Sequence, residues 1–264
     1  MAKIFAVTNQ KGGVGKTTTT VNLAASLAAT RRRILLIDLD PQGNATMGSG
    51  ISKNEVEQTA YELLTKKSKF KDVVCRSEVP GYDVIPANGD LTAAEVELLN
   101  EIGREHRLRV ALSQIRENYD FILIDCPPSL NMLTVNALSA ADGVIIPMQC
   151  EYYALEGLAA LMNTVEQIRE SINPDLSIAG ILRTMYDSRN SLTKDVSDEL
   201  EEYFGDQVYK VAIPRNVRLA EAPSYGVPSL HYDKASKGAI AYLALAGEIV
   251  RKTKAESKLA LAEA

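Results

Sequence analysis

The chain has 264 residues, of which 46% are hydrophobic and 24% charged, so it can bury a sizeable core beneath a charged surface. Its net charge of −5 argues against a protein that coats nucleic acid with its whole surface, because duplex binding depends on phosphate neutralisation. Any DNA contact must then come from a local basic patch. Cys75, Cys126 and Cys150 are single and widely spaced, which suits neither a disulfide framework nor a zinc site and favours a reducing cytoplasm.

Neither a signal peptide nor a membrane span is expected. Residues 1–8 form one short apolar stretch before a glycine-rich loop. No window approaches the roughly 20 apolar residues that cross a bilayer. We therefore expect one domain over residues 1–264, without an N-terminal appendage.

Short apolar segments alternate with helical ones along the chain. The first strand is expected at residues 3–8 and the first helix at residues 17–29. Further strands are expected at residues 34–37, 82–85, 121–124, 144–147 and 178–182. Later helices are expected at residues 91–115, at 155–172, and from about 235, with a charged tail at 254–264 that we expect to fray.

The apolar runs are continuous rather than alternating, which is typical of a parallel sheet buried on both faces. The sequence therefore predicts a doubly wound α/β domain with a mostly parallel sheet and helices on both faces. In such domains, ligands bind outside the carboxyl ends of the strands.

The loop between the first strand and the first helix has the composition of a phosphate-binding loop. It reads Lys11-Gly12-Gly13-Val14-Gly15-Lys16-Thr17-Thr18. The glycines let backbone N–H groups turn toward an anion, and the helix N-terminus adds the positive end of its dipole. We expect Lys16 to reach the β- and γ-phosphates of ATP, Thr17 to ligate Mg²⁺, and Thr18 to contact the α-phosphate. The fold class is therefore that of a P-loop NTPase.

Lys11 is a second lysine within this loop. The general pattern would place a glycine at the position of Gln10, and the extra positive charge is hard to accommodate around one nucleotide that Lys16 already serves. This surplus suggests a site completed by a second subunit, or a differently shaped loop. A solvated surface lysine is the alternative.

Carboxylates follow two of the expected strands. Asp125 ends the apolar run at 121–124, at the place where Mg²⁺ or its water shell is held in such sites. Asp38 and Asp40 follow the run at 34–37. Asp40, on the loop side, is the better candidate to orient the attacking water. Asp38 is either a helper or a structural hydrogen-bond acceptor.

Together these motifs resemble the ParA/Soj group of chromosome- and plasmid-partitioning ATPases, within the deviant-Walker class that includes MinD. The resemblance rests on the loop at 11–18, on Asp-Leu-Asp-Pro-Gln-Gly-Asn from Asp38, and on Ile-Asp-Cys-Pro-Pro-Ser from Ile124. It continues through the segments at 213–224 and 225–228, and so covers nearly the whole chain.

The resemblance implies a role for each nucleotide-site residue. Lys11 would be the signature lysine that reaches across an ATP-sandwich homodimer to the partner's phosphates. Asp40 would serve hydrolysis and Asp125 the magnesium water shell. Pro214 and Asn216 would contact the adenine base. The family's Asn-Arg pair after the sixth strand is replaced here by residues 183–185, Arg-Thr-Met, so base contacts from that segment stay open.

The resemblance also implies partners. In this family the ATP-bound dimer binds double-stranded DNA without sequence preference, and Arg189 and Arg218 match positions used for it, with Lys237 as a third candidate. A ParB/Spo0J-like centromere-binding protein stimulates slow ATP hydrolysis through a short basic N-terminal segment. The expected location is cytoplasmic and nucleoid-associated, and the missing N-terminal extension favours the chromosomal or small plasmid type.

Three alternative functions fit the residues less well. A MinD-like membrane ATPase needs an amphipathic C-terminal helix, but the tail from Lys254 has only Leu259 and Leu261 as bulky apolar residues. A nitrogenase-reductase type needs cluster-binding cysteines, whereas Cys126 and Cys150 are better explained as small buried residues. A switch that holds ATP without turnover is disfavoured by the intact set of Lys16, Asp40 and Asp125. We therefore expect no membrane partner.

Overall fold

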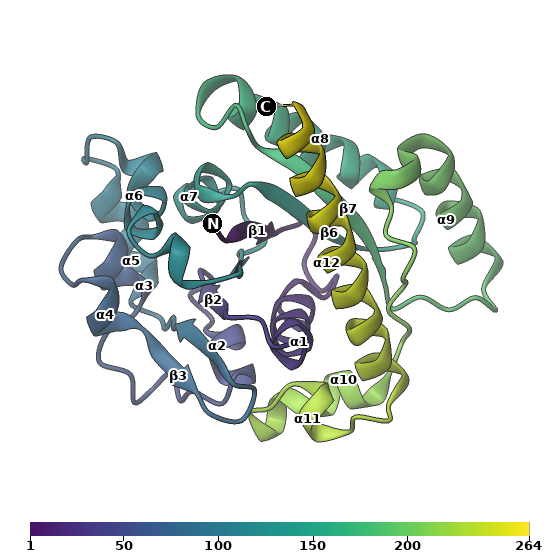
Figure 1. The fold of residues 1–264 in the computed structure, drawn as a ribbon, viewed down its shortest axis with the longest axis horizontal. Helices are drawn as coiled ribbons and strands as arrows, with labels where there is room; N and C mark the ends of the chain where they lie inside the picture. Colours follow the sequence, from purple (N-terminus) through teal and green to yellow (C-terminus); the bar gives the residue numbers. More distant parts are fainter. Residues whose placement is uncertain (264) are drawn as a thin grey trace.

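The computed structural model describes residues 1–263, and the side chains of residues 1–256. Seven strands form a single sheet in the order β3-β4-β2-β5-β1-β6-β7 (Figure 1). The strands are β1 Lys3–Val7, β2 Ile34–Asp38, β3 Cys75–Ser77, β4 Tyr82–Ile85, β5 Phe121–Asp125, β6 Gly143–Gln149 and β7 Ser177–Thr184. All neighbouring pairs are parallel except β3 with β4. The predicted mostly parallel α/β sheet is confirmed.

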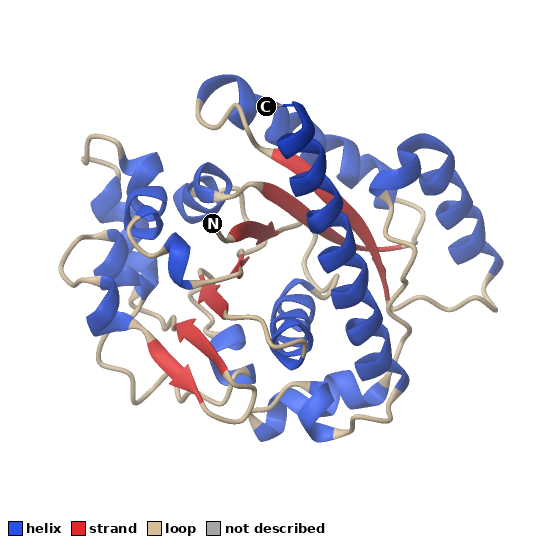
Figure 2. Ribbon diagram, viewed as in Figure 1, coloured by secondary structure: helices blue, strands red, loops and turns tan. Residues whose placement is uncertain are grey.

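Helices surround this sheet (Figure 2). The α-helices of the described chain are α1 Lys16–Ala29, α2 Asn44–Gly48, α3 Ala60–Leu64, α4 Phe70–Val73, α5 Leu91–Leu98, α6 Arg107–Ser113, α7 Met132–Ala140, α8 Ala154–Ser171, α9 Ser191–Phe204, α10 Val217–Glu221, α11 Ser229–Tyr232 and α12 Lys237–Glu263. Four short 3₁₀ helices also occur, η1 Arg104–His106, η2 Arg116–Asn118, η3 Gly205–Gln207 and η4 Ala222–Tyr225.

Each face of the sheet is covered by its own apolar core. In β1, Ile4 and Ala6 face a core shared with α5, α6, α7 and α8, whereas Phe5 and Val7 face a core shared with α1 and α12. Successive residues of a strand point to opposite faces, so a strand buried on both sides must be apolar at every position. This accounts for the continuous apolar runs and for helices on both faces.

One predicted helix was wrong, and one strand was missed. The helix expected at 91–115 is interrupted, because Gly103 adopts φ +66°, a left-handed conformation that a right-handed helix cannot contain. The segment forms α5, η1 and α6 instead. The edge strand β3 was not predicted, since three residues are too few to show a pattern. Most of the tail expected to fray belongs to α12, while residue 264 lies outside the described chain, so fraying stays a prediction.

The carboxyl ends of the central strands meet at one edge of the sheet. Asp125 of β5 is in register with Val7 of β1 on one side and with Asp38 of β2 on the other. The glycine-rich loop leaves β1 at this edge, and the loop carrying Asp40 leaves β2 beside it. The fold thus brings together the sequence segments in which functional residues were predicted.

Candidate nucleotide site

The glycine-rich loop forms an open backbone cradle at the start of α1. Gly13 and Gly15 have φ values of +73° and +87°, and Gly15 occupies the N-cap position without a side-chain cap. The first N–H groups of α1 therefore lack the side-chain acceptor that usually satisfies a helix start. A Cβ added at Gly12 or Gly13 would meet nothing within 4 Å. This geometry fits a bound phosphate group.

Lys16 lies inside the cradle. Its side chain is buried, and its Nζ donates a 3.1 Å hydrogen bond to the carbonyl oxygen of Lys11. Burial lowers the pKa of Lys16, and the negative charge of nearby Asp125 opposes that shift. A buried ammonium group whose only hydrogen-bond acceptor is a loop carbonyl within the described chain is well placed to meet phosphate oxygens.

Asp125 connects the sheet to the first turn of α1. Its two carboxylate oxygens accept hydrogen bonds of 2.8 Å from the hydroxyls of Thr17 and Thr20. Burial raises the pKa of Asp125, and the adjacent charge of Asp38 raises it further. Hydroxyl and carboxylate oxygens in contact at the mouth of a phosphate cradle are the hard ligands that Mg²⁺ prefers. The residues present therefore fit a magnesium ion.

Asp38 and Asp40 have different environments. Asp38 is fully buried, and its carboxylate accepts bonds from the Thr46 N–H at 2.8 Å, the Thr46 hydroxyl at 2.7 Å and the Asp40 N–H at 3.1 Å. It therefore fixes the course of the loop between β2 and α2. Asp40 is half-buried, and its Oδ1 accepts from the Gln42 N–H at 2.9 Å. No hydrogen bond engages Asp40 Oδ2 among the described residues, which leaves that oxygen available for water.

Comparison with known proteins identifies the family. A family model described as an AAA domain matches residues 2–178. The chain is 55% identical to the sporulation initiation inhibitor protein Soj of Bacillus subtilis, over 94% of this chain and 98% of that protein. It is 52% identical to the chromosome partitioning protein ParA of Caulobacter vibrioides, over 95% and 94% of the two chains. The chain belongs to the ParA/Soj family of P-loop ATPases.

One structurally similar protein has been solved with a bound nucleotide. Cobyrinic acid a,c-diamide synthase from Mycobacterium smegmatis, with bound ADP and magnesium, superimposes on this ParA/Soj-family chain with a TM-score of 0.85, at 38% identity and over 96% of both chains. The same enzyme has been solved with an ATP analogue and magnesium. The predicted P-loop fold is thus confirmed.

Lys11 lies outside the cradle of this ParA/Soj-family chain. Its Nζ forms a 2.6 Å ion pair with Glu151, which follows β6, and the Lys11 side chain remains 45% exposed. Tyr152 and Tyr153, next to Glu151, are both largely exposed. The side chain of Lys16 therefore lies inside the cradle. The side chain of Lys11 lies at the surface, near the exposed rings of Tyr152 and Tyr153.

A cavity of about 180 Å³ lies beside the phosphate loop, and Gly15 is one of the residues that line it. Pro214 and Asn216, the residues expected to contact the adenine base, line it together with Thr184 and Met185 of the segment that the sequence left open. Thr184 was missed: its hydroxyl lies 2.8 Å from the Val14 carbonyl oxygen, to which it donates, so it braces the phosphate loop. No motif marked this residue, because the contact spans 170 positions of sequence.

Arg183 does not point into this cavity. Its side chain is buried and donates to the Ser197 hydroxyl and the Tyr209 carbonyl oxygen, both at 2.8 Å, and it pairs with Glu201. Arg183 therefore anchors α9 to β7. The sequence left open whether residues 183–185 contact the base. Thr184 and Met185 line the cavity, whereas Arg183 does not.

The three basic residues predicted to contact DNA lie on adjoining segments. A backbone bridge between Tyr186 and Pro214 brings the loop of Arg189 beside the segment that leads to Arg218. Leu219, next to Arg218, packs against Gly238, next to Lys237. Arg189 pairs with Asp187 at 2.7 Å, and Arg218 pairs with Glu221 at 2.7 Å and with Asp233 at 3.4 Å. A ligand phosphate would have to compete with these carboxylates.

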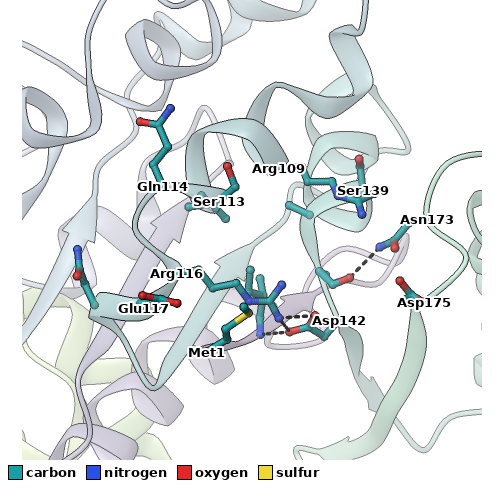
Figure 3. A pocket seen from close by; sticks show the side chains of 15 residues that line it. Met1, Arg109, Ser113, Gln114, Arg116, Glu117, Ser139, Asp142, Asn173 and Asp175 are labelled. Carbon is teal, nitrogen blue, oxygen red and sulfur yellow. Dashed lines mark hydrogen bonds and ion pairs between the residues drawn. The ribbon is translucent and has the colours of Figure 1, made fainter.

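A second cavity, of about 440 Å³, lies at the opposite edge of the sheet, where β1 begins (Figure 3). Arg116 forms a 2.6 Å ion pair with Asp142 there, and Asp142 also accepts a 2.8 Å bond from the Ile4 N–H. Asn173 donates to the carbonyl oxygens of Leu138 and Ala141. These groups satisfy one another and join the starts of neighbouring strands, so we assign this cavity a structural role.

Proposed function

We propose that this ParA/Soj-family chain is an ATPase that dimerises around two ATP molecules and binds double-stranded DNA nonspecifically in that state. Hydrolysis releases the dimer from DNA, and a ParB-like centromere-binding partner stimulates this step during chromosome or plasmid segregation. The observation that carries the proposal is the separation of two lysines. Lys16 is buried in the cradle, whereas Lys11 lies outside it on an exposed surface.

ATP binding is assigned to the cradle. The N–H groups of residues 12–18 surround the phosphates, and Lys16 replaces its bond to the Lys11 carbonyl with bonds to the β- and γ-phosphates. Thr17 and Asp125 would hold Mg²⁺, directly and through water respectively; the ion neutralises charge that builds up on the phosphates. The neighbour solved with ADP or an ATP analogue and magnesium supports this assignment.

The adenine base is assigned to the cavity of about 180 Å³ beside Gly15. Pro214 and Met185 supply apolar surface on which a flat base can lie. The Asn216 Oδ1 already accepts the Arg218 N–H at 2.9 Å as the N-cap of α10. Its Nδ2 makes no hydrogen bond within the described chain and is free to donate to a ring nitrogen.

Hydrolysis is assigned to Asp40. Its unengaged carboxylate oxygen orients a water molecule toward the γ-phosphorus; an oxygen–phosphorus bond forms there as the bond to ADP breaks. Asp38 holds the loop in place through Thr46 and does not need to touch the substrate. Catalysis therefore depends mainly on positioning.

Dimerisation is assigned to the surface around Lys11. For Lys11 to reach a partner's phosphates, its 2.6 Å pair with Glu151 must break, and an exposed pair of this kind contributes only about 0.2–1 kcal/mol. Leu130, Tyr152 and Tyr153 are exposed in the loops that leave β5 and β6 and offer apolar area for a subunit contact.

DNA binding is assigned to Arg189, Arg218 and Lys237. The monomer is acidic overall, with a net charge of −5, so three cations on adjoining segments give little binding by themselves. Two copies side by side would double the number of phosphate contacts. This arrangement makes DNA affinity depend on the dimer and locates the ATP-bound protein on the nucleoid.

The proposal is tested by measuring binding to a labelled duplex with ATP, with ADP and without nucleotide. We expect binding only with ATP and a steep loss of affinity as salt rises. Equal affinity in all three conditions would contradict it. Pelleting with liposomes in the presence of ATP is the companion measurement, because ATP-dependent sedimentation would instead support a MinD-like membrane ATPase.

A further inference from the structure

A groove lies far from the nucleotide site, between α4 and α6 at the left of Figure 1. We call it the lysine groove. Its volume is about 830 Å³; Lys66, Lys69 and Lys71 form its rim, and Phe70, Val110 and Ile115 form its apolar lining. No role in ATP or DNA binding has been assigned to any of these residues.

The charge of the lysine groove is opposite to that of the whole chain. The residues that line it include five cations and one carboxylate, although the chain carries a net charge of −5. Lys66, Lys69 and Lys71 form no ion pair with any described residue, whereas Lys67 is paired with Glu97 at 3.0 Å. Three uncompensated lysines thus surround an opening whose lining includes exposed Val110. Both features favour an anionic ligand that also has apolar groups.

Arg107 provides a second, independent observation. It lines the groove from α6 and is only 9% exposed, and its Nε is buried without a hydrogen-bond acceptor in the described chain. Glu101 pairs with its Nη2 alone. A buried guanidinium nitrogen without a hydrogen-bond acceptor lowers the stability of the folded protein. A carboxylate that replaced Glu101 in side-on geometry would bond to both Nε and Nη2.

We propose that the lysine groove is a docking site for an acidic segment of a partner protein, with apolar side chains on its inner face. Arg107, Val110 and Ala111 of α6 and its C-cap residue Gln114 lie at helical spacing and line the groove from one side of the helix. Such a segment would set its apolar side chains against Phe70 and Val110 and its carboxylates against the lysines. The short basic segment expected of a ParB-like protein would be repelled, so this partner is a different one.

The test uses the full chain and a fluorescent helical peptide of about 16 residues, with leucine or phenylalanine at i, i+3, i+4 and i+7 and glutamate elsewhere. The comparison peptides carry glutamine or lysine in place of glutamate. We expect saturable binding of the acidic peptide only. Absence of saturable binding, or equal binding of the glutamine peptide, would overturn the proposal. The measurement needs neither ATP nor DNA, so its failure is distinguishable from failure of the proposed function.

Variants locate the binding. Lys69→Glu with Lys71→Glu should weaken the acidic peptide at least about tenfold, whereas Lys194→Glu, on α9 at the far side of the molecule, should leave it unchanged (Figure 1). Unchanged binding in the double variant would remove the groove from the proposal. If the double variant instead lost affinity for phosphatidylglycerol vesicles or duplex DNA but not for the peptide, the peptide proposal would be overturned.

Lys66→Gly separates binding from folding. Lys66 has φ +60° just after α3, a conformation that glycine adopts without strain. The variant should therefore raise the melting temperature by about 2–4 °C while weakening the peptide about threefold. A more stable variant with full peptide affinity would show that Lys66 takes no part.

Discussion

At the scale of single residues, the proposed nucleotide site contains charged groups that are buried and held by specific hydrogen bonds. Lys16 and Asp125 lie at the same buried edge of the sheet, and the negative charge of Asp125 raises the pKa of Lys16 against the lowering effect of burial. Asp38, in register with Asp125, adds a second carboxylate at this edge. The nucleotide site therefore gathers one ammonium group and two carboxyl groups at one buried edge of the sheet.

Lys16→Ala should weaken ATP binding about 100-fold, because a charge-assisted bond to phosphate in a buried site contributes about 1.5–3 kcal/mol. Titration with a fluorescent ATP analogue measures this effect. Lys194→Ala, an exposed lysine on α9, is the control and should bind normally. Retention of wild-type affinity by Lys16→Ala would reject the assignment of the loop.

The stability of the protein without nucleotide or magnesium should fall as the pH rises from about 4 to about 8. Burial and the Asp38 charge raise the pKa of Asp125 in the folded state, so the folded chain holds this proton more tightly than the unfolded chain. Stability is then fully present below the ordinary carboxyl pKa and is lost toward the raised one, by up to about 1.4 kcal/mol per pH unit.

Melting curves across this pH range, recorded for the wild type and for Asp125→Asn, isolate the effect. The variant should show the flatter dependence, because residue 125 no longer titrates. Magnesium with ATP should also flatten the wild-type curve. Parallel curves for the two proteins would contradict the assigned cause.

At the scale of elements, the loop between β2 and α2 is held in one geometry by contacts at both of its ends. Asp38 bonds to Thr46 at the start of α2, and Gly43 turns the chain with φ +63° directly against the Ala87 carbonyl oxygen. A Cβ at Gly43 would lie 2.6 Å from that oxygen. The position of Asp40 therefore depends on a glycine that has no chemical role of its own.

Gly43→Ala should destabilise the protein by about 2–4 kcal/mol, through the clash and the strained backbone together, and should slow hydrolysis more than it weakens ATP binding. Urea unfolding and a steady-state ATPase assay measure the two effects. Gly157→Ala, in the first turn of α8 with open space around it, is the matched control and should be neutral or stabilising. Equal stability of both variants would contradict this role of Gly43.

Much of the fold and of the phosphate site could be predicted from sequence, because both depend on local pattern. Each of the predicted features lies within a short stretch of sequence: the continuous apolar strands, the loop at 11–18 and the carboxylates at strand ends. The parts that were missed depend on contacts distant in sequence. The hydrogen bonds of Thr184 to Val14 and of Arg183 to Tyr209 form only once the sheet has folded and brought these residues together. The break at Gly103 was missed because glycine is also tolerated inside helices.

At the scale of the whole molecule, the acidic chain carries two separate groups of basic residues to which binding roles are proposed. In one group, the bridge between Tyr186 and Pro214 joins the segments of Arg189 and Arg218, and Lys237 adjoins them through the contact of Gly238 with Leu219. Another surrounds the lysine groove. Separate basic surfaces allow an acidic protein to hold different anionic partners without binding nucleic acid everywhere.

Arg218→Glu should weaken duplex binding in ATP at least about tenfold and reduce its salt dependence, while ATP-driven dimerisation stays intact. Arg169→Glu is the matched control, because Arg169 also forms an i,i+3 pair and is 47% exposed, compared with 46% for Arg218. Arg189→Glu provides a second variant in case Arg218→Glu disturbs its neighbours Glu221 and Asp233. Full DNA affinity in both Arg189→Glu and Arg218→Glu would exclude this surface.

The most direct test of the account is the mass of the protein in ATP, measured by sedimentation velocity in the Asp40→Ala background with and without Lys11→Ala. Asp40→Ala should block hydrolysis and accumulate a species of twice the 28.7 kDa chain mass. Adding Lys11→Ala should return it to the single-chain mass while nucleotide still binds through Lys16. A dimer that persists without Lys11, or a monomer in both proteins, would contradict a nucleotide site shared between two subunits.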